Sequence, residues 1–219
     1  AGSGSEVTVA AVVTDSNTHE KYAVADFKLM PDFAILDPEL TVGVPKHLTA
    51  STGMDALTHA IEAYIGKNGT DFTNDKALKA SKMIIDNLEN VYNDGTNIDG
   101  RSAMLLASNY AGQAFTRANV GYVHAIAHSI GGLYGVAHGL ANAIILPKVL
   151  EYYGEAAYEK LAEIALYVNL GDKSEYKKDL ALKLIAKIKD MNKNMDIPLG
   201  VKELKESDIS LIARRAVKE

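Results

Sequence analysis

The sequence predicts a mostly helical protein, a helical bundle preceded by a short β segment. After Pro45 the apolar residues recur three and four positions apart, as Ile84, Leu88 and Val91 do, which is the period of an amphipathic helix. Before Pro45 the chain has short runs of β-branched residues bounded by turn residues, which is typical of strands. The connections between the expected helices are short, and this favours a bundle of neighbouring helices.

Composition narrows the classes of protein that this chain can belong to. Of its 219 residues 47% are hydrophobic and 23% are charged. A chain of this length and composition can bury a sizeable core without disulfides or structural metal ions. A net charge of -5 argues against a nucleic-acid-binding surface. The absence of cysteine excludes disulfides, thiolate metal ligands and a cysteine nucleophile. With no bilayer-length apolar run and no visible secretion signal, the expected location is the cytoplasm.

The β segment is expected to hold three short strands. They cover residues 7–14, 22–25 and 33–36, with turn signals at 15–17 and 30–32 between them. Three short strands do not make a domain, so they resemble one edge of a sheet whose other strands are absent.

Eight helices are expected in the rest of the chain. They cover residues 53–65, 74–92, 101–118, 123–134, 140–153, 156–168, 175–192 and 208–217. The last pattern runs to the end of the chain without a stop signal, and we therefore expect the chain to be truncated there. Glycines at 131, 132, 135 and 139, around the end of the fourth of these helices and the start of the fifth, are expected to interrupt them.

Candidate metal ligands form two compact groups in apolar surroundings. Asp55 and His59 are four residues apart, so on a helix they project from the same face. His124 and His128 repeat this spacing, and His138 follows. Burying a carboxylate and several imidazoles together is costly unless they are paired or bind a cation. The pattern therefore favours a divalent metal site.

The spacing leaves several alternatives open. A carboxylate with imidazoles suits Fe²⁺, Zn²⁺, Mn²⁺, Co²⁺ or Ni²⁺ better than Ca²⁺ or Mg²⁺. A structural hydrogen-bond network of the same side chains is the competing interpretation. Spacing also does not show whether His124 and His128 both bind metal or whether one of them is a proton donor beside it. Residues 1–5, a Gly/Ser stretch, fit either a linker or a natural turn.

Several motifs resemble the iron-containing (group III) alcohol dehydrogenases. They are GSGSEVT at 2–8, ILDPELT at 35–41, TASTGMDALTHAIEAY at 49–64, VHAIAHSIG at 123–131, AHGLANA at 137–143 and IPLGV at 197–201. The resemblance covers essentially the whole chain and favours a natural turn at residues 1–5. It implies a dehydroquinate synthase-like, helical C-terminal domain at residues 45–219. Residues 1–44 would then be the β-strand remnant of an N-terminal nucleotide-binding domain.

The resemblance also assigns roles to individual residues. It makes Asp55, His59, His124 and His138 the ligands of a divalent metal, with Fe²⁺ as the first expectation and Zn²⁺ as the alternative. It places His128 beside the metal as the catalytic residue, where it would relay a proton. In the intact enzyme the metal would polarise the oxygen of a small alcohol or aldehyde while NAD or NADP exchanges the hydride. The resemblance also allows a homodimer.

The cofactor site implied by the resemblance is incomplete in this sequence. Ser3, Lys21 and Leu48 match positions that line the dinucleotide, whereas Ala10 stands where some relatives have a polar contact residue. The family's Gly-rich phosphate-binding motif is absent from these 219 residues. We therefore expect a C-terminal fragment that is inactive alone. Two other functions remain as alternatives, a non-redox metallohydrolase and a non-catalytic helical domain with a structural His/Asp cluster.

Overall fold

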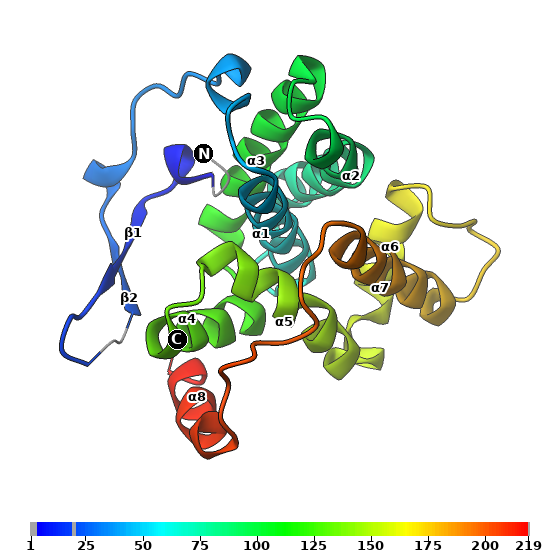
Figure 1. Cartoon of the computed structure of the whole chain (residues 1–219). Coiled ribbons are helices and arrows are strands. Elements are labelled where there is room, and N and C mark those ends of the chain that lie inside the picture. The colour runs from blue at the N-terminus through cyan, green and yellow to red at the C-terminus, as the bar shows by residue number, and fades with distance from the viewer. Residues whose placement is uncertain (1–3, 19–20, 219) are drawn as a thin grey trace.

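The computed structural model describes residues 4–18 and 21–218, which form a helical body with a small β hairpin beside it (Figure 1). The hairpin consists of β1 (Ala10–Thr14) and β2 (Lys21–Ala25). The helices are α1 (Lys46–Ile65), α2 (Asp71–Asn93), α3 (Ile98–Ala118), α4 (Tyr122–Tyr134), α5 (His138–Tyr153), α6 (Glu155–Tyr167), α7 (Lys177–Asn194) and α8 (Ile209–Ala216). The prediction of a mostly helical bundle with a short β segment is confirmed.

Helix α1 is the centre of the body. It packs against α2 and α3 on one side and against α5 on another (Figure 1). Leu57, Ala60 and Ile61 have no exposed surface, and nearly every residue from 49 to 64 is buried. A helix that is buried on nearly every side must be covered by other helices all round. The packing of the surrounding helices therefore fixes the positions of the α1 side chains.

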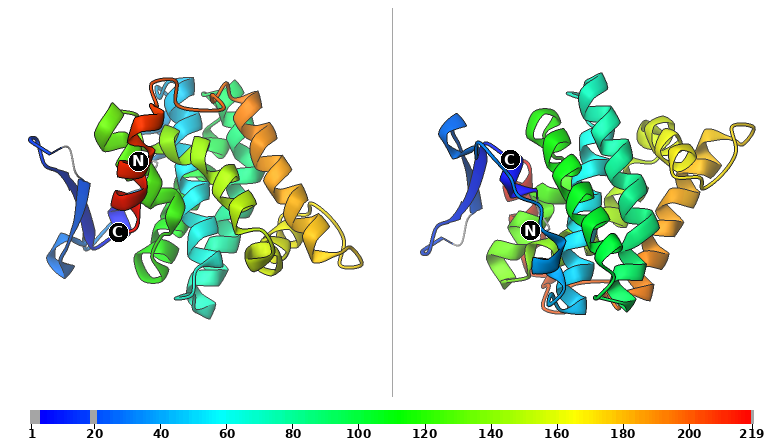
Figure 2. Two further views of the ribbon diagram at one scale, coloured as in Figure 1. Left: turned by 90° about the horizontal axis from the view of Figure 1, so that it is seen from below. Right: turned by 90° about the horizontal axis from the view of Figure 1, so that it is seen from above.

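The outer helices complete the body around α1. Helices α6 and α7 pack on each other, and α4 packs between α5 and α8 (Figures 1 and 2). Leu161 of α6 and Leu184 of α7 are fully buried, which extends the core away from α1. Among the described residues, no helix has both the length and the apolar character needed to cross a membrane.

The predicted helices are present, and their boundaries lie within three residues of expectation except at the start of α1. Helix α1 begins at Lys46, directly after Pro45, and not at Gly53. Its first two turns contain small polar residues without an apolar stripe, and several of these are buried by close packing of neighbouring helices. Of the glycines expected to interrupt helices, only Gly135 ends one, α4, while Gly139 lies within the first turn of α5.

The β hairpin is antiparallel and lies at one side of the helical body, where β2 contacts α4 (Figure 2). Ala10 pairs with Ala25 and Thr14 with Lys21. The expected third strand is wrong, since residues 33–36 form no strand in the described part of the chain. Phe33 and Ile35 are 89% and 92% exposed there. An apolar run becomes a strand only when a neighbouring strand satisfies its backbone groups, and the hairpin supplies none at this point.

Candidate metal centre

Four side chains from three helices converge at one point in the bundle. Asp55 and His59 come from α1, His124 from α4 and His138 from the start of α5. Each offers one ligand atom, and these atoms all lie within 4.8 Å of one another. The first three side chains are buried, and His138 is partly exposed. These are the four residues that the sequence predicted as ligands.

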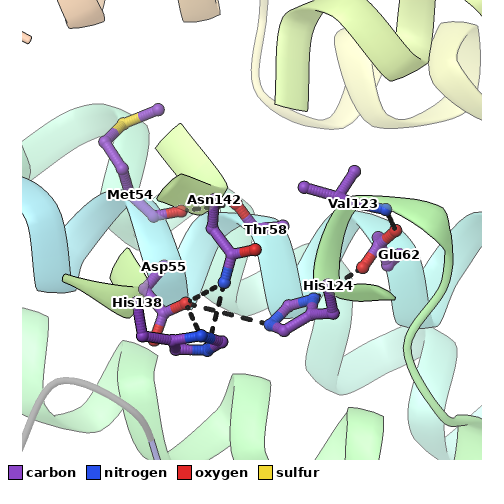
Figure 3. A network of polar contacts seen from close by, with 8 residues as sticks. All are labelled: Met54, Asp55, Thr58, Glu62, Val123, His124, His138 and Asn142. Atoms are coloured by element: carbon purple, nitrogen blue, oxygen red, sulfur yellow. Dashed lines mark hydrogen bonds and ion pairs between the residues drawn. The ribbon is translucent and has the colours of Figure 1, made fainter. Parts of the chain in front are cut away.

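Local structure explains this convergence. Asp55 and His59 are one turn apart on α1 and project from the same face. Helices α4 and α5 are joined by a short turn after Tyr134, so His124 and His138 approach α1 from consecutive elements. Asp55 Oδ1 lies 3.4 Å from His138 Nε2 and 3.8 Å from His124 Nε2 (Figure 3).

Two further polar residues, which the sequence analysis left without a role, contact the cluster. Asn142, one turn after His138 on α5, is fully buried and donates a 2.6 Å hydrogen bond to Asp55 Oδ1. The same amide nitrogen lies 3.1 Å from His138 Nε2. Glu62 of α1 contacts His124 from the side opposite to Asp55 (Figure 3). Asn142 is four residues after His138, and Glu62 is three residues after His59. This helical spacing from a predicted ligand is the signal in the sequence that could have identified both residues.

The cluster contains buried nitrogen atoms without partners. His59 Nδ1 and His124 Nε2 are buried and accept or donate no hydrogen bond within residues 4–18 and 21–218. Buried polar atoms are normally paired, because leaving one unpaired costs roughly 1–3 kcal/mol. His124 Nε2 lies 3.8 Å from Asp55 Oδ1, so a cation bound between these two atoms would remove the cost for this nitrogen. The donor set therefore fits a divalent metal, for which one carboxylate and three imidazoles are ordinary ligands.

The surroundings keep two of the imidazoles neutral. Burial, together with the neighbouring His124 and His128, lowers the pKa of His59 well below its usual value of 6.5. Burial also lowers the pKa of His138 to about 4, although the nearby Asp55 carboxylate opposes this shift. Metal ligation requires the neutral imidazole, so both side chains are held in the form that binds a cation.

Ring stacking arranges the histidines as well. The His59 ring lies between Phe115 of α3, at a centroid distance of 4.1 Å, and His124, at 4.4 Å. His128 is one turn beyond His124 on α4, and its ring stacks on His138 at 5.0 Å. His128 thus lies beside the four converging ligand atoms without being one of them, in a partly buried position.

The predicted dinucleotide contacts are only partly described by the structure. Ser3 and most of the Gly/Ser stretch lie outside the described residues. Lys21 begins β2, and Leu48 lies in the first turn of α1, where it is 41% exposed. Leu48 is about two helical turns before Asp55, which lies at the middle of α1.

The fold and the cluster together define a class, a helical domain whose inward-facing side chains offer a mixed Asp/His ligand set. Comparison with known families makes the class specific. Residues 49–219 match the family described as Fe-containing alcohol dehydrogenase, C-terminal, and residues 1–38 match iron-containing alcohol dehydrogenase. The chain belongs to the iron-containing alcohol dehydrogenase family, of which it represents the helical C-terminal portion.

Individual relatives agree with this assignment. The chain is 42% identical to 1,3-propanediol dehydrogenase of Klebsiella pneumoniae, with all of the chain and 57% of that protein covered. It is 41% identical to NAD-dependent methanol dehydrogenase of Bacillus methanolicus, with 100% of the chain and 58% of that protein covered. The solved alcohol dehydrogenase from Oenococcus oeni superposes with a TM-score of 0.95 at 36% identity and covers 100% of this chain. That match covers 57% of the solved chain, so this chain spans little more than half the length of its relatives.

Proposed function

We propose that this chain supplies the metal-binding side of an NAD(P)-dependent alcohol dehydrogenase that interconverts small alcohols with aldehydes or ketones. The observation that carries the proposal is the convergence of four ligand atoms within 4.8 Å in a chain of this family. The names of relatives, which include 1,3-propanediol, methanol and butanol dehydrogenases, support small alcohols as the substrate class. One of these names specifies NAD and another NADPH, so the proposal covers both dinucleotides.

In this proposal Asp55, His59, His124 and His138 hold one divalent cation, with Fe²⁺ first and Zn²⁺ second. Such an ion, when bound, supplies Lewis acidity toward an alcohol or carbonyl oxygen. The apolar and stacked surroundings of the ligands fix their directions and exclude water on the buried side. Because His128 is partly exposed and stacked on His138, we assign it the transfer of the substrate hydroxyl proton to solvent.

The proposal divides the chain between two sides of the active site. Residues 45–219 form the metal-binding helical domain, and residues 1–44 belong to the nucleotide-binding side. Ser3, Lys21 and Leu48 would line one wall of the dinucleotide site in the whole protein. Assayed as 219 residues, the chain should show little turnover, because it lacks a Gly-rich turn for the pyrophosphate.

Metal stoichiometry tests the proposal directly. The chain is stripped with a chelator, loaded anaerobically with Fe²⁺ or with Zn²⁺, dialysed and analysed for metal content. We expect one ion per chain in the wild type and in His128→Ala, and loss of the ion in His59→Ala. His128→Ala is the matched control, because it removes an imidazole from the same cluster without removing a proposed ligand.

Two outcomes would overturn the proposal. No binding by the wild type at saturating Fe²⁺ and Zn²⁺ would leave a structural His/Asp network as the role of the cluster. Equal loss of metal in both variants would show that the ligand assignment is wrong.

A further inference from the structure

Glu62 occupies the place where α1 meets the beginning of α4. Its side chain is buried, with 2% exposure, although it carries a carboxyl group. Oε1 accepts a 2.8 Å hydrogen bond from the backbone N–H of Val123, and Oε2 lies 2.6 Å from Nδ1 of His124. Both oxygens are therefore used, one by the backbone of α4 and one by a proposed metal ligand (Figure 3).

The contact with Glu62 determines where His124 carries its proton. A carboxylate oxygen only accepts hydrogen bonds, so Nδ1 is the protonated nitrogen in this contact. In the neutral ring the lone pair is then on Nε2. Nε2 is buried, has no hydrogen-bond partner in the described residues and lies 3.8 Å from Asp55 Oδ1. Figure 3 shows the His124 ring between Glu62 on one side and Asp55 on the other.

Glu62 also fixes the position of the helix that carries His124. Val123 is the second residue of α4, and its N–H is one of the helix-start donors that have no partner within the helix. Gly121 precedes the helix and has no side chain to cap it. A Cβ atom at Gly121 would lie 2.9 Å from Glu62 Oε1, so the glycine leaves room for the carboxylate. The negative charge at the start of α4 is also favourable for the helix dipole.

The other buried histidine of the cluster is held differently. His59 Nδ1 has no hydrogen-bond partner among the described residues, and its ring is held by stacking on Phe115. Stacking constrains the plane of a ring but does not select which nitrogen carries the proton. His124 is therefore the one buried imidazole of the described cluster whose protonated nitrogen is set by a carboxylate.

We propose that Glu62 is a positioning residue that holds His124 in the Nδ1–H tautomer and directs Nε2 into the metal site. The metal-binding part of this inference rests on the proposed function. A partner of this kind fixes the orientation of a ligand and raises its basicity, and loss of one typically weakens metal binding by about 10–100-fold.

Glu62→Gln is the informative variant because it preserves the shape of the side chain. A glutamine has one acceptor oxygen and one donor NH₂ group. If its oxygen stays on the Val123 N–H, its NH₂ group faces His124 Nδ1, which must then accept. The ring proton moves to Nε2, the atom that would bind the metal. We expect folded protein, a changed tautomer and metal affinity reduced by about 10–100-fold.

The tautomer is measured by long-range ¹H–¹⁵N NMR on the metal-free, ¹⁵N-histidine-labelled full chain. The pH is set about two units above the ordinary histidine pKa of about 6.5, so that neutral rings dominate. Signals of His124 are assigned by their absence in His124→Gln. Glu163→Gln is the matched control, because it removes another carboxylate that contacts α1, through Tyr64, outside the cluster. Zn²⁺ affinity of each variant is then measured by competition with a chromophoric chelator.

The outcomes separate positioning from a purely structural role. An Nδ1–H ring in the wild type, an Nε2–H ring in Glu62→Gln and no change in Glu163→Gln support the proposal. An Nε2–H ring in the wild type would overturn it, as would a Glu62→Gln variant with unchanged tautomer and Zn²⁺ affinity. If Glu62→Gln does not fold, the wild-type tautomer decides alone. Failure of the wild type to bind metal refutes the proposed function, whereas the metal-free tautomer measurement still tests Glu62.

Discussion

Gly139 is the point where the backbone of α5 touches the backbone of α1, one residue after His138. A Cβ atom added there would lie 2.4 Å from the carbonyl oxygen of Ser51, 2.9 Å from its carbonyl carbon and 3.2 Å from Asp55 Cβ. The nearest of these atoms belong to the backbone of a buried helix, so no side-chain rotation can relieve the clash. Gly139→Ala therefore requires α5 to move by about 1 Å away from α1 to restore ordinary contact.

The expected size of the effect follows from this displacement. Overpacking of a well-packed interface costs about 1–3 kcal/mol, and the better helix propensity of alanine returns up to about 1 kcal/mol. We expect the free energy of unfolding of the metal-free chain to fall by about 1–2 kcal/mol. Metal sites tolerate departures of only about 0.2 Å in ligand distance, so moving His138 away from Asp55 should weaken metal binding at least about tenfold.

Urea denaturation followed by circular dichroism measures the first effect, and chelator competition with Zn²⁺ measures the second. Gly200→Ala is the control, because no described atom lies within 4 Å of a Cβ at that position. It should change the free energy of unfolding by less than about 0.5 kcal/mol. The reasoning is refuted if Gly139→Ala keeps wild-type stability and affinity, or if both variants lose the same amount.

Two further substitutions test the core and its pH dependence. Leu88→Ala should lower the free energy of unfolding by about 2–5 kcal/mol in urea denaturation, because Leu88 is fully buried. The matched variant Leu182→Ala, at a 41% exposed position, should lose far less, and equal losses would contradict the packing argument. Burial and the Glu62 charge raise the pKa of Tyr153 to about 12. The stabilising contribution of Tyr153 is complete below its unfolded-state pKa of about 10 and is lost as the pH rises through 12. Between about pH 9 and pH 12 the free energy of unfolding of the wild type should therefore fall on the order of 1 kcal/mol more than that of Tyr153→Phe. This value allows for solvent screening of a half-buried group. Parallel urea stability curves for these two proteins would contradict the assignment.

The helices could be predicted because their signal is local. Ile84, Leu88 and Val91 mark a buried face by spacing alone, and α2 follows that prediction. The four proposed ligands were also found from spacing and family motifs, and the structure brings them together. Their role as ligands stays a prediction. The first turns of α1 were missed because small polar residues give no periodic signal, although tertiary packing buries them.

The sequence by itself determined which side chains share a helix face, because the period of the helix fixes that for Asp55 and His59. Only the tertiary structure decided which faces meet. Glu62 reaches His124 across 62 positions, and Asn142 reaches Asp55 across 87. Residues 33–36 show the converse, since an apolar run without a neighbouring strand stayed irregular. The contacts of Glu62 with His124 and of Asn142 with Asp55 depend on how closely whole helices approach each other. The packing of both helix surfaces sets that distance, as it does where Gly139 meets Ser51. No local sequence pattern records this distance.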